Sequence, residues 1–440
     1  MTFSGTAINL ALGVLYSWSI IAKSMKLPVG DGGWGWTATQ TQLPYAVACA
    51  MFAIMMVFAG RAQDKYGPRI VASIGGGLTG LGLIVASFAS PNNVFMAVLG
   101  FGVLAGAGIG LGYASATPPA IKWFPAAKKG LISGLVVAGF GLASVYIAPL
   151  TTMLIKENGI NQTFLLLGIA FFVVSVIFSQ FLKNPPAGYV PAEKPSKRQG
   201  EAGSTSAPKK HDYDWYEMLK TRQFYLLWIM FALGAAAGLL TIGSLASIVS
   251  AKVAGGSTDT AVLAEAAKWS SLMVAILAVA NAGGRVVAGF FSDLIGRVRT
   301  MRLVFFYQAI CMLVFPELGT ISFLILGSIF VGFNYGALLA LFPSTTGDYF
   351  GTKNLGVNYG LVFTAWGFGG VLGPIMAGMI RDATGSFSLA FQISAALCLI
   401  AALVTFITKA PKAVLVSSSV EEAKVAVERN LKVLDGSSAS

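Results

Sequence analysis

Residues 60–69 (GRAQDKYGPR) and residues 289–297 (GFFSDLIGR) carry the same short pattern of glycine, aspartate, glycine and arginine. The shared positions are Gly60, Asp64, Gly67 and Arg69 in the first copy, and Gly289, Asp293, Gly296 and Arg297 in the second. The aspartates are 229 positions apart (293 − 64), and each copy directly follows a long apolar stretch. One such match can arise by chance in a chain with 52 glycines, so the surrounding sequence must decide whether the chain is duplicated.

Two further matches link the same two regions. Gly139-Phe140-Gly141 corresponds to Gly367-Phe368-Gly369, and Phe124-Pro125 corresponds to Phe342-Pro343. Several matches in one order indicate two parallel halves, as in transporters that rock about a central site. We expect the Gly-Asp-Gly loops to be mechanical, with an ion pair that forms in one conformation and breaks in the other.

The composition is that of a membrane protein. Hydrophobic residues make up 55% of the 440 positions and charged residues 11%, whereas a soluble domain carries about 25% charged residues. Roughly 240 apolar residues are enough for about twelve spans of ~20 residues each. Twelve such stretches occur, at about 5–27, 40–60, 69–89, 94–118, 130–155, 162–183, 223–251, 265–292, 300–317, 321–345, 355–380 and 387–408.

The predicted fold is therefore an all-α membrane protein with twelve transmembrane helices in two parallel six-helix halves. We expect an N-terminal bundle over residues 1–183 and a C-terminal bundle over 222–408. The polar stretch 184–221 reads as a cytoplasmic linker whose end, DWYEMLK, forms a short amphipathic helix. Residues 409–440 form a cytoplasmic tail.

The basic residues predict the orientation. Of the 30 lysines and arginines, 23 fall on the side of the linker and both termini, six on the other side, and Arg285 inside a span. Basic residues collect on the cytoplasmic side of membrane proteins. We therefore expect a multi-pass protein of the cell membrane (inner or plasma membrane) with both termini cytoplasmic, and the net charge of +12 requires no nucleic acid.

The Gly-Asp-Gly loops and the six-plus-six plan resemble the major facilitator superfamily. Several stretches also resemble the oxalate/formate antiporter family and the monocarboxylate transporters, including bacterial lactate transporters. These stretches are Tyr16-Ser17-Trp18, GRAQDKYGPR (60–69), KWFPAAKKGLISG (122–134), EMLKTRQFYLLW (217–228) and FPSTTGDYFGTKNLGVNYG (342–360). The similarity, from about residue 10 to 408, implies the major facilitator fold and transport by alternating access.

Arg285 stands out within its span. It lies eight residues before Asp293, so at ~1.5 Å per residue it is about 12 Å from the membrane edge, near the midplane of a ~30 Å core. An arginine there costs about 3 kcal/mol unless it faces a cavity or a partner. All 18 acidic residues fall in loops, in the tail or at span ends, which argues against a buried ion pair. The sequence therefore predicts a site for a substrate anion, because the planar fork of arginine binds a carboxylate with two hydrogen bonds.

The family resemblance implies more about this site. In the family an arginine at this place binds the substrate carboxylate. Asn281 stands where animal monocarboxylate transporters usually carry an aspartate, so it cannot titrate; it can orient Arg285, donate to the substrate or bond to another helix. Trp366 stands where the oxalate carrier has a lysine. A single buried cation balances one carboxylate, which favours a monocarboxylate such as lactate, pyruvate or formate.

Aromatic and polar residues complete the predicted site. Tyr335, with Asn334, and Tyr113 fall within spans, where each phenol either donates to the substrate or packs between helices. Phe363 and Trp366 are candidates for an apolar wall that sets the size of the acid. We expect Tyr16 and Trp18 nearer the outer side, Trp34 and Trp36 in an interface belt, and Lys23 and Lys26 as outer anchors.

Taken together, these features predict a secondary active transporter that moves a small, lactate- or pyruvate-like monocarboxylate, with a proton, by alternating access. The alternative within this class is a carboxylate exchanger of the oxalate/formate type. A drug exporter for cations is disfavoured because no carboxylate lies within the membrane. No P-loop, HExxH motif or nucleophile elbow occurs, so we expect no enzyme, no cofactor and no metal. We expect a monomer whose partners are the bilayer, the carboxylate and the proton.

Overall fold

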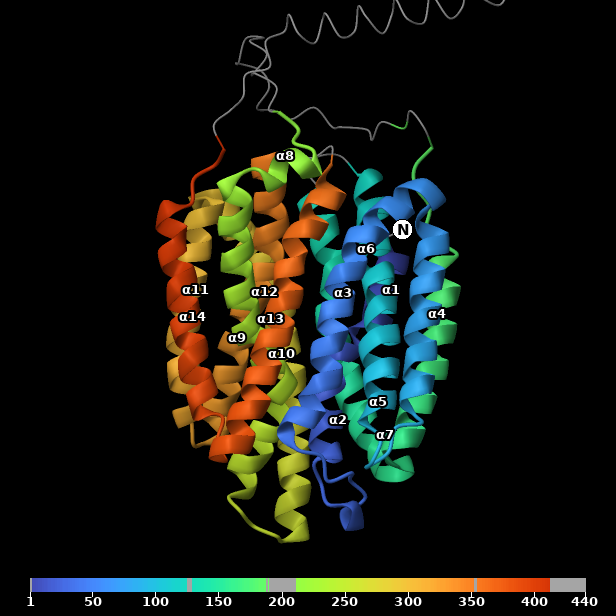
Figure 1. The fold of residues 1–440 in the computed structure, drawn as a ribbon, viewed down its shortest axis with the longest axis vertical. Helices are drawn as coiled ribbons and strands as arrows, with labels where there is room; N and C mark the ends of the chain where they lie inside the picture. The colour runs from blue at the N-terminus through green and yellow to red at the C-terminus, as the bar shows by residue number, and fades with distance from the viewer. Residues whose placement is uncertain (1, 125–128, 187–188, 190–210, 352–353, 412–440) are drawn as a thin grey trace, which may run out of the picture.

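A computed structural model of the chain describes residues 2–124, 129–186, 189, 211–351 and 354–411 (Figure 1). Its first half comprises α1 (Thr2–Leu12), α2 (Trp18–Met25), α3 (Ala38–Tyr66), α4 (Pro68–Ala86), α5 (Val94–Ala97), α6 (Gly106–Lys122) and α7 (Lys129–Ser179). Its second half comprises α8 (Trp215–Leu219), α9 (Arg222–Ala254), α10 (Thr260–Ile295), α11 (Arg297–Val314), α12 (Ile321–Phe350), α13 (Leu355–Thr384) and α14 (Ser388–Ile407).

Eleven helical segments in the described residues are long and apolar enough to cross a membrane. One of them, α7, crosses twice. It runs over 51 residues but is broken at Gly159, whose φ of 76° and ψ of 176° lie outside the helical region. An unbroken helix of that length would span roughly 75 Å, more than twice the ~30 Å of a bilayer core. The prediction of an all-α membrane fold with twelve crossings is therefore confirmed.

Short irregular turns connect pieces of two of the spans. The 3₁₀ turn Gly13–Ser17 joins α1 to α2, and the π-helical segment Val98–Ala105 joins α5 to α6. Such segments change which side chains share a face of the helix. In these two spans, a single helical period therefore does not predict which side chains share a face.

The helices form two bundles that stand side by side, with α1–α7 in one and α9–α14 in the other (Figure 1). The bundles meet where α3 packs against α13 and where α7 packs against α10. Glycines permit the close approach: a Cβ added at Gly367 of α13 would lie 2.3 Å from the Cβ of Ala53 in α3. The short helix α8 lies at one end of the molecule, which we call the linker end; the opposite end, with the turn between α2 and α3, is the loop end.

The duplicated Gly-Asp-Gly pattern corresponds to one repeated backbone feature at the linker end. Gly67, between α3 and α4, has φ 84° and ψ 157°, and Gly296, between α10 and α11, has φ 94° and ψ 147°. Residues with a side chain rarely adopt a positive φ of this kind. The glycine at this place in the pattern is therefore explained by the turn between two spans.

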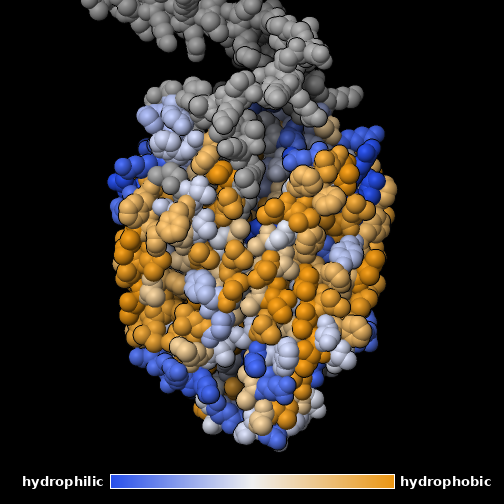
Figure 2. Space-filling model, turned by 180° about the vertical axis from the view of Figure 1, so that it is seen from behind, coloured by the Kyte–Doolittle hydropathy of each residue, from blue (hydrophilic) through white to orange (hydrophobic). Residues whose placement is uncertain are grey.

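The surface fits a protein embedded in lipid. Figure 2 shows a broad hydrophobic band around the middle of the molecule, with hydrophilic residues toward both ends. Many large apolar side chains of the helices are exposed, including Phe58, Phe290, Leu313 and Leu403. Trp34 and Trp36, expected in an interface belt, are instead buried and packed on each other with ring centroids 4.8 Å apart.

Candidate functional site

Arg285 of α10 lies between the two bundles, and only 4% of its surface is exposed. Its guanidinium donates three hydrogen bonds to neutral oxygens. Nε donates to Asn281 Oδ1 at 2.9 Å, Nη1 to the main-chain oxygen of Val137 at 2.9 Å, and Nη2 to Tyr16 Oη at 3.3 Å. Val137 and Tyr16 belong to the first bundle, so the arginine joins both halves of the molecule.

No carboxylate of the described residues forms an ion pair with Arg285. The ion pairs among these residues are His211–Glu217, Arg297–Asp293 and Arg297–Asp348, which do not involve it. The partners that the sequence did not reveal are a backbone carbonyl and a phenol from the other half.

Asn281 is fully buried, and one end of its amide has no partner. Because a guanidinium can only donate, the contact with Arg285 identifies the atom facing it as Oδ1. The opposite atom, Nδ2, is buried and makes no hydrogen bond of good geometry, with the Tyr16 hydroxyl as a polar neighbour of the amide. A buried unsatisfied donor costs about 1–3 kcal/mol, so this atom is suited to an acceptor on a ligand.

Four tyrosines lie within electrostatic range of Arg285: Tyr16, Tyr113, Tyr335 and Tyr359. Tyr113 and Tyr335 were expected at the site, whereas Tyr16 was expected nearer the outer side. Tyr16 lies in the 3₁₀ turn between α1 and α2, and its Oη accepts a hydrogen bond from Arg285. Tyr359, which closes the stretch FPSTTGDYFGTKNLGVNYG, was not singled out as a site residue.

Aromatic rings from both bundles form a continuous cluster beside these tyrosines. Phe363 and Trp366 of α13 stack with centroids 4.9 Å apart, and the indole Nε1 of Trp366 donates to Tyr335 Oη at 2.6 Å. Phe52 of α3 is the centre of the cluster. Its ring lies 5.0–5.8 Å from four others, those of Tyr113, Phe140, Phe363 and Trp366.

Nothing in the sequence distinguishes Phe52 from the other 29 phenylalanines. Its place at the contact of the two bundles depends on how α3 packs against α13. Asn334 lies apart from the cluster: its Nδ2 approaches Cys311 Sγ of α11 at 3.9 Å. The structure therefore brings together Arg285, Asn281, Tyr113, Tyr335, Phe363 and Trp366, and directs the Asn334 amide toward α11.

Gly141 of α7 explains how the two bundles come so close at Arg285. A Cβ added at this glycine would lie 3.2 Å from Asn281 Oδ1 and 3.6 Å from Arg285 Nη2. The N–H of residue 141 bonds to the carbonyl of Val137 in a regular helix. The missing side chain at Gly141 therefore leaves the Val137 carbonyl accessible to Arg285.

The predicted switch loops are described in part. In the second half, Arg297 bridges helices α10 and α12, 2.7 Å from Asp293 Oδ1 and 3.0 Å from Asp348 Oδ2, and it also contacts Ser292. This network lies within one bundle. In the first half, a Cβ added at Gly60 would lie 3.6 Å from the backbone of Gly356 in α13, and Arg69 is exposed. The Asp64 side chain lies outside the described residues.

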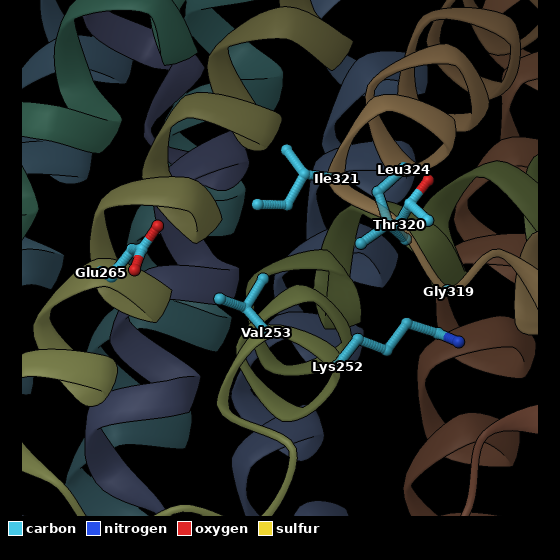
Figure 3. Close-up of a pocket in the computed structure, with 7 residues that line it drawn as sticks. All are labelled: Lys252, Val253, Glu265, Gly319, Thr320, Ile321 and Leu324. Atoms are coloured by element: carbon cyan, nitrogen blue, oxygen red, sulfur yellow. The ribbon is translucent and has the colours of Figure 1, made fainter.

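A surface pocket near the loop end is separate from this site (Figure 3). It has a volume of about 370 Å³ and is lined by Lys252, Val253, Glu265, Gly319, Thr320, Ile321 and Leu324. Lys252 Nζ donates a hydrogen bond to the main-chain oxygen of Pro316 at 2.7 Å, so the ammonium group already has an acceptor within the protein. In the described part of the chain, no group of three or more His, Cys, Asp and Glu side chains is placed to hold a metal ion.

Comparisons with known proteins agree with this architecture. A model of the Major Facilitator Superfamily matches residues 1–322 and 269–437. The oxalate:formate antiporter of Oxalobacter formigenes is 32% identical over 399 residues, which cover 90% of this chain and 87% of that protein. Monocarboxylate transporter 11 of Homo sapiens is 25% identical over 417 residues, covering 84% of this chain and 82% of that protein.

The fold is also similar to solved structures. A bacterial homolog of the human lysosomal transporter Spinster, in an inward-facing and occupied conformation, has a TM-score of 0.62 at 15% identity. The similarity covers 91% of this chain and 96% of that one, and at this identity it concerns the fold alone. The family match and the transporter relatives point to a transporter rather than an enzyme. The chain belongs to the major facilitator superfamily of membrane transporters.

Proposed function

We propose that this protein is a secondary active transporter for a small monocarboxylate, lactate- or pyruvate-like, which it moves with a proton by alternating access. One observation supports this function above all. A buried arginine, without an acidic partner among the described residues, lies between the two bundles beside further hydrogen-bond donors. A carboxylate anion is the ligand whose chemistry matches that set.

The donors around Arg285 outnumber the acceptors. Arginine has five N–H groups, and three of them bond to protein oxygens. Asn281 Nδ2 has no partner. Tyr16 Oη and Tyr335 Oη each accept a hydrogen bond, so their protons are free to be donated. These groups together can satisfy the two oxygens of one carboxylate.

The charge at the site supports a monoanion. Trp366, where the oxalate carrier of the family has a lysine, offers a neutral indole that is bonded to Tyr335. A second carboxylate would therefore enter the membrane without a cation, at a cost of several kcal/mol. The aromatic rings of Phe363, Trp366 and Phe52 favour acids with a short apolar chain.

We further propose that the linker end faces the cytoplasm of a cell membrane. The 23 basic residues assigned to that side against six on the other support this orientation. The two bundles would then rock about the Arg285 region to open the site to either side.

Transport by purified protein in liposomes tests the proposal. We expect uptake of radiolabelled lactate, pyruvate or formate, and Arg285→Ala should reduce it on the order of 100-fold, because charge-assisted hydrogen bonds are lost. Arg299→Ala is a matched control, since this exposed arginine also loses one charge. If uptake by Arg285→Ala equalled that of the control, Arg285 would not be the carboxylate site.

The second candidate function is carboxylate exchange. It is favoured by the similarity to a protein named as an oxalate:formate antiporter. An imposed pH gradient, acidic outside, should drive uptake into empty liposomes if a proton is coupled. Uptake that requires a carboxylate inside the liposomes and ignores the pH gradient would instead identify an exchanger.

A further inference from the structure

Two of the three acceptors of Arg285 come from the opposite bundle. Arg285 lies in α10, whereas the carbonyl of Val137 is in α7 and Tyr16 is in the turn before α2. A main-chain carbonyl has two lone pairs, and a regular helix uses one of them. The second lone pair of Val137 is thus available to a cation, and Gly141 keeps it accessible.

The bundles touch on both sides of this contact. Toward the loop end, Asp382 of α13 accepts hydrogen bonds from the N–H groups of Ala38 and Thr39 of α3, at 2.9 and 2.8 Å. Toward the linker end, the guanidinium of Arg61 lies 5.7 Å from the ring centroid of Trp215 in α8. Contacts between the two halves therefore lie on both sides of Arg285 along the helices, and the acceptors of Arg285 are neutral protein oxygens.

A carrier with a permanent cation at its centre faces an electrostatic problem on its return step. Burying an unpaired charge is far more costly than burying a paired one. A site with no substitute acceptor can therefore close only around an anion, which makes exchange obligatory. A site with its own acceptors can close without one.

We propose that the Val137 carbonyl, with Tyr16 and Asn281, takes the place of the substrate carboxylate on Arg285, so that the carrier can return without a counter-anion. The inference rests on the proposed function, because it assumes that Arg285 binds the carboxylate. With this substitute acceptor the protein can carry out net transport, and exchange of one carboxylate for another is optional. Substrate and Val137 then compete for the same guanidinium.

Two fluxes measured with the same liposomes test this inference. Liposomes are loaded with radiolabelled lactate, or with pyruvate or formate if those are transported better, and diluted into buffer with or without the same unlabelled acid. We expect efflux into carboxylate-free buffer, where the return step occurs without an anion. Electrical neutrality is maintained with a proton ionophore and valinomycin in both experiments.

A variant at Gly141 tests the residues involved. Gly141→Val would place a side chain between α7 and the Arg285 guanidinium. It should therefore weaken the hydrogen bond from Arg285 to the Val137 carbonyl and raise the ratio of exchange to net efflux on the order of tenfold, the effect of one lost hydrogen bond to a charged group. Exchange reports that the variant is folded and still binds the substrate. The ratio of the two fluxes removes any loss of substrate binding that contact of the new side chain with Asn281 and Arg285 imposes on both. Gly283→Val is the control, since no neighbouring atom lies within 4 Å of a Cβ at that position.

The outcomes separate the two proposals. Fast exchange with no net efflux by the unaltered protein would overturn the inference and leave the proposed substrate class intact. An unchanged flux ratio in Gly141→Val would overturn the role of the Val137 carbonyl. A protein that moves none of these acids in either experiment would contradict the proposed function itself.

Discussion

Asn281 shows how much of the site depends on individual atoms. It lies one helical turn before Arg285, and its Oδ1 accepts the Nε–H of the arginine at 2.9 Å. The same contact turns the unpartnered Nδ2 away from Arg285. One side chain therefore orients the arginine and also provides a donor for a ligand.

An aspartate at position 281 should weaken substrate binding. Asn281→Asp would place a carboxylate next to Arg285, where it competes with the substrate for the guanidinium. We expect the KM for lactate uptake to rise about tenfold or more, and to fall again at acid pH as the aspartate is protonated. Asn281→Leu removes the same amide without adding a charge, so the same KM in both variants at every pH would contradict the competition.

At the scale of the element, irregular helices change which side chains of a span face the site. Five residues, Gly13–Ser17, form a 3₁₀ turn within the first span. A 3₁₀ helix turns about 20° more per residue than an α-helix, so five residues rotate the following face on the order of 100°. Tyr16 lies in that turn, so a single helical period does not give the direction of its side chain.

The break in α7 at Gly159 allows a test of whether the chain needs a glycine there. Gly159 has φ 76° and ψ 176°, and no neighbouring atom lies within 4 Å of a Cβ at this position. Gly159→Ala should therefore add no clash and cost only backbone strain, about 1–3 kcal/mol. A lower melting temperature in detergent is expected relative to Gly283→Ala, a helical glycine with equally open space. Equal melting temperatures would show that the chain reverses without need of glycine.

At the scale of the whole molecule, the loop end is closed by contacts between the bundles. Asp382 accepts hydrogen bonds from the first two residues of α3, with Thr39 Oγ1 also donating at 2.5 Å. Nearby, Lys26 Nζ donates to Ser247 Oγ of α9 at 3.2 Å. Lys26, expected to be an outer anchor, is instead part of this closure.

The charge of Lys26 should make closure of the loop end depend on pH. Burial first, and the positive charge of Arg381 second, lower the pKa of Lys26 to about 8, against the opposing effect of Asp382. Opening would hydrate the amine and return its pKa toward its ordinary value of 10.5. The open form therefore binds more protons between about pH 8 and 10.5, so closure strengthens as the pH rises through this window.

Distances between spin labels on α2 and α9 at the loop end would measure this equilibrium. The closed population should grow between pH 8 and 10, and Lys26→Met should remove the pH dependence. The other groups at this position are Arg381 and Asp382, with Ser247 and the ring of Phe387 in contact. A pH response that persists in Lys26→Met would assign the effect to another group.

Much of this architecture could be read from the sequence because a bilayer imposes simple requirements. Each crossing needs about 20 apolar residues, and the repeated glycines at 67 and 296 mark equivalent turns with positive φ. Arg285 could be predicted as a site residue because a cation in mid-span is costly unless it faces a cavity or a partner. These arguments use position along the chain alone.

The order of the amino acids is therefore enough to predict twelve crossings, the duplication and an arginine in mid-span. Which groups surround Arg285 depends on how the helices pack: packing brings Tyr16, Phe52 and the Val137 carbonyl to the site and directs Asn334 toward Cys311. The physical reason is that hydropathy fixes how deep a residue lies in the membrane. The rotation of each helix about its axis, and hence what its side chains face, is set by packing against the other helices.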